Sequence, residues 1–359
     1  MENIKRILIM MPNWLGDAVM ALPLVQLLRE TYPSAFLAIL TPDHLEKFYT
    51  FQPHIDKVIP WKKTKSIKGT FQIVHKLNSL NFDLAVLCPN SFFSALIIAM
   101  SRIKRRIGYD KSFRKFLLTD HLPFPKKKKK KHQTRLFIAL GLALWDKPEA
   151  PKFSNSVTIP EFNKQSIKLS LKRNHNIEAK SGLIGLAIGS AYGPAKNWSV
   201  ERYRQLGLAL YKKYNTRILL LGTQKDHDSA HFMVQHLENV FINLCGQTGL
   251  DEVQSLLSLC RVFIGNDSGL AHVAALLNTP SIVIFGSTSP FFSQPLGNSV
   301  KIVYSGVDCS PCFKRTCPLG TMECMKSIKV KHIMEKVDTL MKGSIKKNVK
   351  LKRHPYNLQ

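Results

Sequence analysis

The amino-acid sequence predicts an α/β protein made of two doubly wound halves, each with a parallel sheet covered by helices on both faces. Three observations support this prediction. Short apolar segments alternate with stretches of helical periodicity, which is typical of parallel sheets. The 359 residues exceed what one hydrophobic core usually spans. A second series of apolar segments begins near Gly182, so we expect two such domains that face a central cleft.

The first half begins with an apolar strand and a turn. The strand is expected at Arg6–Met11 and the turn at residues 12–16, after which residues 17–31 carry apolar side chains at helical spacing. Tyr32-Pro33 ends this helix. Separated by helical stretches, the further strands are expected at Phe36–Leu40, Lys57–Ile59, Leu84–Leu87 and Arg106–Gly108.

The second half repeats this alternation. Its strands are expected at Leu183–Ile188, Arg217–Leu221, Phe241–Leu244, Arg261–Ile264, Ser281–Phe285 and Lys301–Tyr304. We interpret residues 151–181, which hold two prolines and many charged side chains, as the connection between the halves. We therefore expect an N-terminal domain at 1–160, a C-terminal domain at 161–330, and a C-terminal helix with a basic tail at 331–359.

The charge of the chain is strongly unbalanced. It has 52 basic and 24 acidic residues, a formal net charge of +28, although its hydrophobic content of 45% is ordinary for a globular protein. Such a charge attracts nucleic acid, an anionic membrane surface or a phosphorylated substrate. The simpler alternative is a Lys-rich surface that is only solvated.

The sequence also suggests a compartment. No run reaches the roughly 18 apolar residues of a spanning helix. Pro12, Asn13, Gly16 and Asp17 interrupt the apolar N-terminal run, which makes it a poor signal peptide. We expect a cytoplasmic protein whose seven cysteines are free thiols or metal ligands rather than disulfides.

The most informative motif is Gly-Asn-Asp-Ser-Gly-Leu-Ala-His at 265–272. It lies between two strand-like runs and opens a short helix, which is the position where open α/β sheets bind ligands and where helix N–H groups favour phosphate. Asp267 and Ser268 can bond a ligand's hydroxyls or phosphates, and His272 lies about one turn later. We expect a nucleotide-type ligand here.

Two other turns follow strands. Asp17 either caps the first helix or presents a carboxylate to a substrate hydroxyl. In residues 189–199, glycines allow close approach of the backbone to a ligand, and Lys196 either neutralises a diphosphate or is merely solvated. Neither turn has the spacing of a dinucleotide fingerprint, and no Walker A sequence occurs.

Three features are weaker. The polar turn at 222–227 could contact a sugar. The spacing of Cys309, Cys312, Cys317 and Cys324 could serve Zn²⁺ or an iron–sulfur cluster, but it lacks the paired form of a zinc ribbon, and a basic binding loop explains the segment equally well. Lys126–Lys131 form a surface loop suited to anionic headgroups. No aromatic platform or finger motif indicates nucleic-acid binding.

Four segments together resemble the lipopolysaccharide heptosyltransferases of glycosyltransferase family 9. They are Met-Pro-Asn-Trp-Leu-Gly-Asp-Ala-Val-Met-Ala-Leu-Pro (11–23), Gly-Pro-Ala-Lys-Asn-Trp (193–198), Asn-Asp-Ser-Gly-Leu-Ala-His (266–272) with Phe-Gly-Ser-Thr-Ser-Pro (285–290), and Cys-Ser-Pro-Cys-Phe-Lys-Arg-Thr-Cys-Pro-Leu-Gly (309–320). The second and fourth segments favour the branch that adds the second heptose over the branch that adds the first.

The resemblance implies a GT-B fold of two Rossmann-like domains and a role for each site residue. Asp17 matches the catalytic aspartate, and Lys196 matches the lysine that neutralises the donor phosphates. The N-terminal domain would bind the acceptor through Asn13, Trp14 and Gly16. The C-terminal domain would bind the donor through Ser190, Ala191, Lys196, Asp226, Thr248, Asp267, Ser268, Gly269 and His272. Ala191 stands where some relatives carry a hydroxyl that alanine cannot supply.

The same resemblance implies an inverting transfer of L-glycero-D-manno-heptose from ADP-heptose, with no required cofactor or metal. The implied acceptor is the first heptose of heptosyl-Kdo2-lipid A, reached by a peripheral protein on the inner face of the inner membrane. The alternatives are the enzyme that modifies Kdo directly, or another family 9 transferase. A basic nucleic-acid-binding protein with a Rossmann-like fold is a remote alternative.

Overall fold

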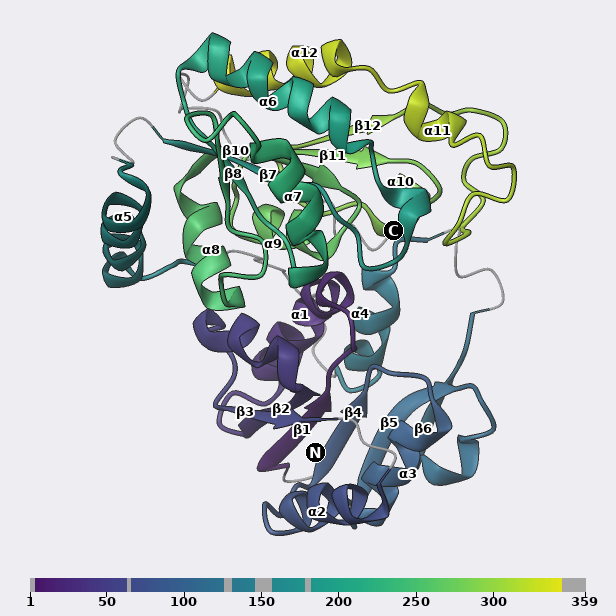
Figure 1. The fold of residues 1–359 in the computed structure, drawn as a ribbon. Helices are drawn as coiled ribbons and strands as arrows, with labels where there is room; N and C mark the ends of the chain where they lie inside the picture. Colours follow the sequence, from purple (N-terminus) through teal and green to yellow (C-terminus); the bar gives the residue numbers. More distant parts are fainter. Residues whose placement is uncertain (1–3, 63–65, 126–130, 146–156, 178–181, 344–359) are drawn as a thin grey trace. The chain divides into compact units, whose positions relative to one another are not determined.

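The computed structural model describes residues 4–62, 66–125, 131–145, 157–177 and 182–343, and the chain divides into two compact units (Figure 1). Unit 1 is Met1–Asn155 and unit 2 is Ser156–Gln359. This division falls close to the expected boundary after residue 160. Lys126–Lys130 and the tail after residue 343 lie outside the described residues.

Unit 1 alternates strands with helices from its first residues onward. Its elements are β1 (Arg6–Met10), α1 (Leu15–Thr31), β2 (Phe36–Pro42), the 3-10 segment η1 (Asp43–Phe51), β3 (Lys57–Trp61), α2 (Ile67–Asn78), β4 (Leu84–Leu87), α3 (Phe92–Met100), β5 (Arg105–Asp110), the short η2 (Lys115–Leu117), β6 (Asp120–Pro123) and α4 (Thr134–Leu142).

Unit 2 begins with a helix and then repeats the alternation. Its elements are α5 (Glu161–His175), β7 (Leu183–Ala187), η5 (Pro194–Lys196), α6 (Val200–Tyr214), β8 (Ile218–Leu220), η6 (Gln224–Asp226), α7 (His227–Val234), β9 (Phe241–Asn243), α8 (Leu250–Leu259), β10 (Cys260–Asn266), α9 (Gly269–Leu276), β11 (Ser281–Phe285), α10 (Pro290–Ser293), β12 (Val300–Tyr304), α11 (Glu323–Lys326) and α12 (Val330–Gly343).

The two sheets have the same topology. The strand order is β3-β2-β1-β4-β5-β6 in unit 1 and β9-β8-β7-β10-β11-β12 in unit 2, and all neighbouring strands are parallel. Each order reverses direction at one place, between β1 and β4 or between β7 and β10. Ligands of doubly wound sheets bind at the carboxyl ends of the strands at this switch point.

Helices cover both faces of each sheet. In unit 1, α2 and α3 pack against one face and α1 and α4 lie together on the other (Figure 1). A Cβ at Gly141 of α4 would stand 2.6 Å from the Leu27 side chain of α1, so glycine permits this close helix contact. In unit 2, α6, α7 and α12 share a core with the sheet.

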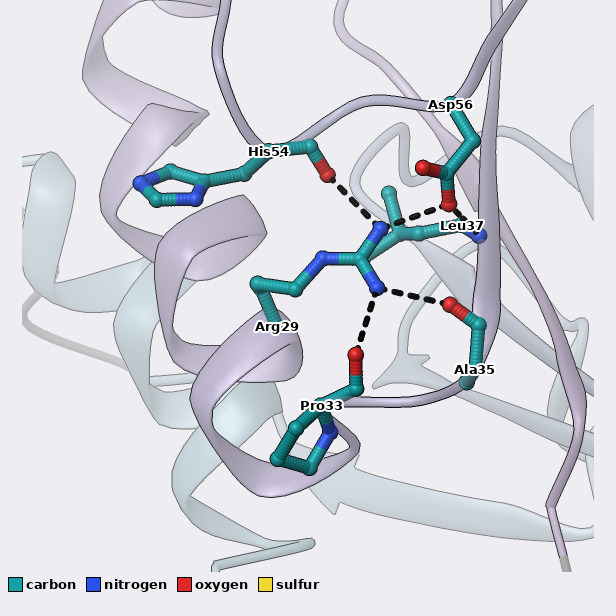
Figure 2. Close-up of polar contacts among 6 residues, drawn as sticks. All are labelled: Arg29, Pro33, Ala35, Leu37, His54 and Asp56. Carbon is teal, nitrogen blue, oxygen red and sulfur yellow. Dashed lines mark hydrogen bonds and ion pairs between the residues drawn. The ribbon is translucent and has the colours of Figure 1, made fainter.

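A clamp around Arg29 closes the loops at the amino ends of the unit 1 strands (Figure 2). The guanidinium donates to the carbonyl oxygens of Pro33 and Ala35, at 3.1 and 2.7 Å, and to Asp56 Oδ2 at 2.6 Å. The same carboxylate oxygen accepts the Leu37 backbone N–H at 2.7 Å. The clamp therefore joins the end of α1 to the start of β2 and to the chain entering β3, at the edge opposite the ligand-binding one.

Two elements differ from the sequence prediction. The predicted connection 151–181 contains helix α5, which packs against α8 through the buried side chains of Ile167 and Leu171. The rest of α5 is too polar for its periodicity to be read from the sequence. The sixth strand of unit 1, β6, was also missed, because an edge strand of sequence Asp-His-Leu-Pro has little strand character.

The last helix belongs to unit 2. Ile333, Val337 and Met341 of α12 are buried in the core formed by α6 and the sheet. In the described part of the chain, no helix combines the length and the apolar character needed to cross a bilayer.

Candidate active site

In unit 1, Asp17 lies at the switch point of the sheet. Residues 11–14 follow β1, and Asp17 occupies the first turn of α1, where the helix dipole favours a negative charge. It is not the N-cap, because Trp14 holds that position. Asp17 Oδ1 accepts a hydrogen bond of 2.8 Å from Gln133 Nε2, which precedes α4. The carboxylate is half-buried and held in a defined direction.

The predicted acceptor-binding residues lie just before Asp17 in the sequence. Asn13 and Trp14 are exposed, and Gly16 is half-buried. Trp14 presents an indole ring, which is an uncommon side chain to leave half in water and a common surface for a sugar ring to rest on. These residues give the turn after β1 both polar and apolar groups beside a carboxylate.

A buried cation, Arg114, contacts the loop that follows β4, the other strand of this switch point. Arg114 donates to the backbone oxygen of Pro89 at 2.5 Å and to Asn90 Oδ1 at 3.0 Å, in the loop after β4, and to the Tyr109 oxygen at 3.0 Å. Burial lowers the pKa of Arg114 to about 10. Arg114 thus ties the loop after β5 to the loop after β4.

In unit 2, a buried ion pair lies at the corresponding switch point. Lys196 follows β7 and donates from Nζ to Asp267 Oδ2 at 2.5 Å and to the Asp267 backbone oxygen at 3.2 Å. Thr288 Oγ1 donates to the same carboxylate oxygen at 2.6 Å. An ammonium has three N–H bonds, and among the described residues only Asp267 accepts from Lys196. The surface-lysine alternative is therefore wrong, since Lys196 is buried and oriented.

Asn266 holds the two strands of this switch point together. Its side-chain nitrogen donates to the Ile188 oxygen after β7, at 2.8 Å, and its Oδ1 accepts from the Trp198 backbone N–H and the Tyr203 hydroxyl, both at 3.1 Å. All of these groups are buried, so the loop bearing Lys196 is fixed against the loop bearing Asp267.

Helix α9 begins directly at this site. Ser268 is its N-cap residue, Gly269 is its first residue, and His272 is buried in its first turn. The side chain of Ser268 does not cap the helix. Its hydroxyl oxygen is buried and has no hydrogen-bond partner among the described residues, and the same is true of Ser287 and Thr248. Buried polar groups are normally satisfied, so these hydroxyls are suited to bonding a ligand.

The remaining predicted donor residues lie around β7 and β8. Ser190 is half-buried and Ala191 is exposed in the loop after β7. Asp226 Oδ2 accepts from the Thr223 backbone N–H at 2.8 Å and from its hydroxyl at 2.9 Å, so this oxygen closes the turn after β8. A Cβ on Gly189 would stand 1.8 Å from Asp226 Oδ1. Glycine is therefore required for the two loops to approach each other.

Comparison with known proteins decides the family. The family model of glycosyltransferase family 9 (heptosyltransferase) matches residues 70–323, which is well over half of the chain. The chain belongs to glycosyltransferase family 9. It is therefore a glycosyltransferase of the heptosyltransferase family.

Curated relatives and solved structures agree with this assignment. This chain is 31% identical to lipooligosaccharide heptosyltransferase 2 of Haemophilus ducreyi over 317 residues. The match covers 83% of this chain and 88% of the relative. The structure of Escherichia coli ADP-heptose lipopolysaccharide heptosyltransferase II matches with a TM-score of 0.83 and 26% identity, over 95% of this chain and 100% of that chain. Escherichia coli heptosyltransferase WaaC with ADP matches with a TM-score of 0.70 and 16% identity, over 93% and 99%, and shows the fold alone. The predicted GT-B fold is confirmed.

Sequence reasoning missed several residues of this family 9 site. Gln133 and Arg114 in unit 1, and Tyr192 and Thr288 in unit 2, were not among the predicted site residues. The Tyr192 ring makes two cation–π contacts: its centroid lies 4.7 Å from Lys196 Nζ and 5.5 Å from the Arg315 guanidinium. Apart from the contact between Tyr192 and Lys196, these contacts join segments more than 20 residues apart, so no local spacing could have revealed them.

The cysteine-rich segment packs beside the Lys196 loop. The Tyr192 hydroxyl donates to the Phe313 oxygen at 2.7 Å, and the Ala195 N–H donates to the Arg315 oxygen at 3.0 Å. A Cβ on Gly193, whose φ is 150°, would stand 2.6 Å from that Arg315 oxygen. The segment therefore packs against the Lys196 loop through its backbone and through Arg315.

The thiols of this segment are neighbours. Burial raises the pKa of the Cys324 thiol, and the nearby thiols of Cys309, Cys312 and Cys317 act in the same direction. The backbone N–H of Met322 holds the pKa of the Cys317 thiol below its usual value. All seven cysteines are described and free, and no group of three or more His, Cys, Asp or Glu among the described residues is arranged to hold a metal ion.

Proposed function

We propose that this family 9 enzyme is an inverting heptosyltransferase that transfers L-glycero-D-manno-heptose from ADP-heptose to the first heptose of the lipopolysaccharide inner core. The observation that carries the proposal is the site of unit 2. There, the oriented ammonium of Lys196, the start of α9 and two hydroxyls follow the adjacent strands β7, β10 and β11. These hydroxyls, of Ser268 and Ser287, have no hydrogen-bond partner among the described residues.

We propose that this site binds the diphosphate of the donor. The departing ADP gains negative charge as the bond to heptose breaks, and preorganised donors stabilise that charge without reorganising. Asp267 fixes the Lys196 ammonium, whose remaining N–H can point at a phosphate. The amides at the start of α9 supply further donors. His272, Thr248, Ser190, Ala191 and Asp226 are proposed to complete the pocket for the sugar and the nucleoside. No cofactor enters the proposed reaction.

Asp17 is proposed to act as the general base. It would take the proton of the acceptor hydroxyl as that oxygen attacks the anomeric carbon of heptose. The hydrogen bond from Gln133 orients this carboxylate. Because the family inverts the anomeric centre, a single displacement suffices and no covalent nucleophile is needed. Asn13, Trp14 and Gly16 are proposed to bind the acceptor beside this carboxylate.

The choice of acceptor rests on the relatives. The enzyme from Haemophilus ducreyi and the Escherichia coli structure both carry the name of heptosyltransferase 2 or II and match most of this chain. The direct test supplies purified ADP-heptose with either Kdo2-lipid A or heptosyl-Kdo2-lipid A, and measures ADP release and product mass. We expect transfer to the heptosylated acceptor. Transfer to Kdo2-lipid A alone would assign the first-heptose reaction instead.

The net charge of +28 is proposed to bring the enzyme to its membrane-anchored acceptor. We propose a cytoplasmic protein bound peripherally to the anionic inner face of the inner membrane, with Lys126–Lys131 contributing. Replacing these lysines with Gln should weaken binding to anionic liposomes, and unchanged binding would remove the run from this role. A gel-shift assay should show no specific nucleic-acid complex, since tight, salt-sensitive DNA binding without ADP release would favour the nucleic-acid alternative.

A further inference from the structure

Unit 1 exposes large apolar side chains in an unusual place. Six such side chains are exposed among its described residues, and all of them follow the carboxyl end of a strand or begin the helix after it: Trp14, Ile67, Phe71, Phe92, Phe113 and Phe116. In unit 2, the exposed large apolar side chains are spread over helices and loops, as in Phe162 of α5 and Phe232 of α7. The exposure in unit 1 is concentrated at the edge that carries Asp17.

The segment after β5 holds two of these rings away from the core. Phe113 is 93% exposed and Phe116 is 74% exposed, and the Phe116 ring lies 6.1 Å from that of Phe92. Ser112 and Phe113 both have positive φ, at 60° and 55°. Non-glycine residues rarely adopt this conformation, so the backbone is strained where the Phe113 ring enters solvent.

Arg114 makes this conformation rigid. It lies between the two phenylalanines and is fully buried, while its guanidinium reaches the loop after β4 through Pro89 and Asn90. A segment anchored in this way cannot turn its rings inward without removing the buried cation from its hydrogen bonds. The two rings are therefore presented to solvent by a built structure rather than by a loose loop.

The surroundings of the rings are basic. Residues 102–125 contain seven Lys or Arg and two acidic residues. One of these acids, Asp120, is paired with Arg105. Beside the rings, Lys111 and Lys115 are exposed, and Lys111 Nζ lies 4.2 Å from the centroid of the Phe124 ring. Exposed aromatic rings within a basic surround are typical of surfaces that lie in the interface of an anionic bilayer.

We infer that the segment from Lys111 to Leu117 is a membrane-docking loop, in which Phe113 and Phe116 enter the headgroup region of an anionic bilayer while Lys111 and Lys115 contact its phosphates. The inference rests on the proposed function for its purpose, because the loop would bring the Asp17 edge to a lipid-anchored acceptor. Its evidence is independent of that function.

The test uses the full-length protein and vesicles that contain no acceptor. Co-sedimentation is measured with phosphatidylcholine vesicles and with vesicles containing phosphatidylglycerol. We expect the double variant F113S/F116S to bind the anionic vesicles at least tenfold more weakly than the parent protein. The matched control is Phe291→Ser, which removes an 84% exposed phenylalanine from α10 of unit 2 and should leave binding unchanged.

Two further measurements define the mode of binding. K111Q/K115Q should weaken binding to anionic vesicles only, with a smaller salt dependence than the parent protein has. Phe113→Trp should give a fluorescence that brominated lipid quenches, which reports entry of this ring into the bilayer.

Three outcomes would overturn the inference. They are unchanged vesicle binding by F113S/F116S, equal losses in that variant and in Phe291→Ser, and a change from dimer to monomer in the double variant, which would assign the rings to a second copy of this chain.

Heptosyl transfer to a soluble acceptor without acyl chains is measured in parallel. If the parent protein does not transfer heptose to this acceptor, the proposed function is wrong, but the docking inference is unaffected. If F113S/F116S binds vesicles as well as the parent protein does, the docking inference is wrong, but the proposed transferase function is unaffected.

Discussion

The two sheets share one strand order, and the edges at which their ligands are expected carry different chemistry. In unit 2, the switch point between β7 and β10 holds a buried pair, Lys196 and Asp267, and nearby hydroxyl groups that have no partner in the part of the chain that the structure describes. In unit 1, the switch point between β1 and β4 has a half-buried carboxylate, Asp17, and exposed aromatic rings. We propose that the one topology serves two different binding tasks.

The difference follows from what each edge must stabilise. A diphosphate is small and highly charged, so fixed cations and N–H donors in a shielded site bind it best. A lipid-linked sugar acceptor is large and partly apolar, so an open edge with aromatic rings suits it. Variants at the two edges should therefore affect different steps of the reaction, and the following predictions test that separation.

The largest effect is expected from Asp17→Asn in unit 1. Removing the base should lower kcat by about 10²- to 10⁴-fold, because the acceptor hydroxyl then loses its proton without assistance. Binding of ADP, measured by calorimetry, should be unchanged because the proposed donor site lies in unit 2. Turnover equal to that of the parent enzyme would exclude Asp17 as the base.

Lys196→Ala should impair the donor side by about 10²- to 10³-fold in kcat/KM, because a preorganised charge on the departing diphosphate is lost. Calorimetry should show weaker ADP binding as well. The matched control is Lys314→Ala, an exposed lysine of the neighbouring segment, which should have little effect.

Folding must be separated from function in this variant. Lys196→Ala leaves Asp267 buried without its cation, which is destabilising, so thermal unfolding is measured alongside. The variant K196M/D267N removes both charges and should recover stability without recovering ADP binding. Recovery of ADP binding would show that the pair serves the fold rather than the donor.

Gln133→Ala should have a smaller effect, about 10- to 100-fold on kcat, because Asp17 remains and only its orientation is released. The KM for ADP-heptose should not change, since Gln133 belongs to unit 1 and the proposed donor pocket belongs to unit 2. A rise in that KM with unchanged kcat would contradict a positioning role for Gln133.

The smallest effect on activity is expected from the clamp of Figure 2, at the opposite edge of the unit 1 sheet. Arg29→Ala removes hydrogen bonds from a charged donor to three carbonyl oxygens and to Asp56, so the free energy of unfolding should fall by about 1–3 kcal/mol. Activity per folded molecule should be unchanged. Denaturant unfolding and kinetics at low temperature measure both quantities, and a loss of turnover without a loss of stability would connect this edge to the active site.

Much of the architecture could be read from local pattern. The bounds predicted for Leu84–Leu87 and Ser281–Phe285 agree with β4 and β11, because strands buried on both faces appear as short apolar runs between polar turns. The same logic placed Asp17, Lys196 and Asp267 in the segments that follow strands of the two sheets. Helix α5 and strand β6 escaped this logic because most of their side chains are polar or exposed.

The sequence by itself determined the α/β class, the two repeated halves and the positions at which polar residues leave the strands, since these depend on hydrophobicity and turn residues close together in the chain. Only the tertiary structure decided the partners of those residues. Lys196 meets Asp267 across 71 positions, and Gln133 meets Asp17 across 116. The presentation of Phe113 likewise depends on where buried Arg114 finds its acceptors. Such pairings arise from strand order in space, which no local spacing encodes.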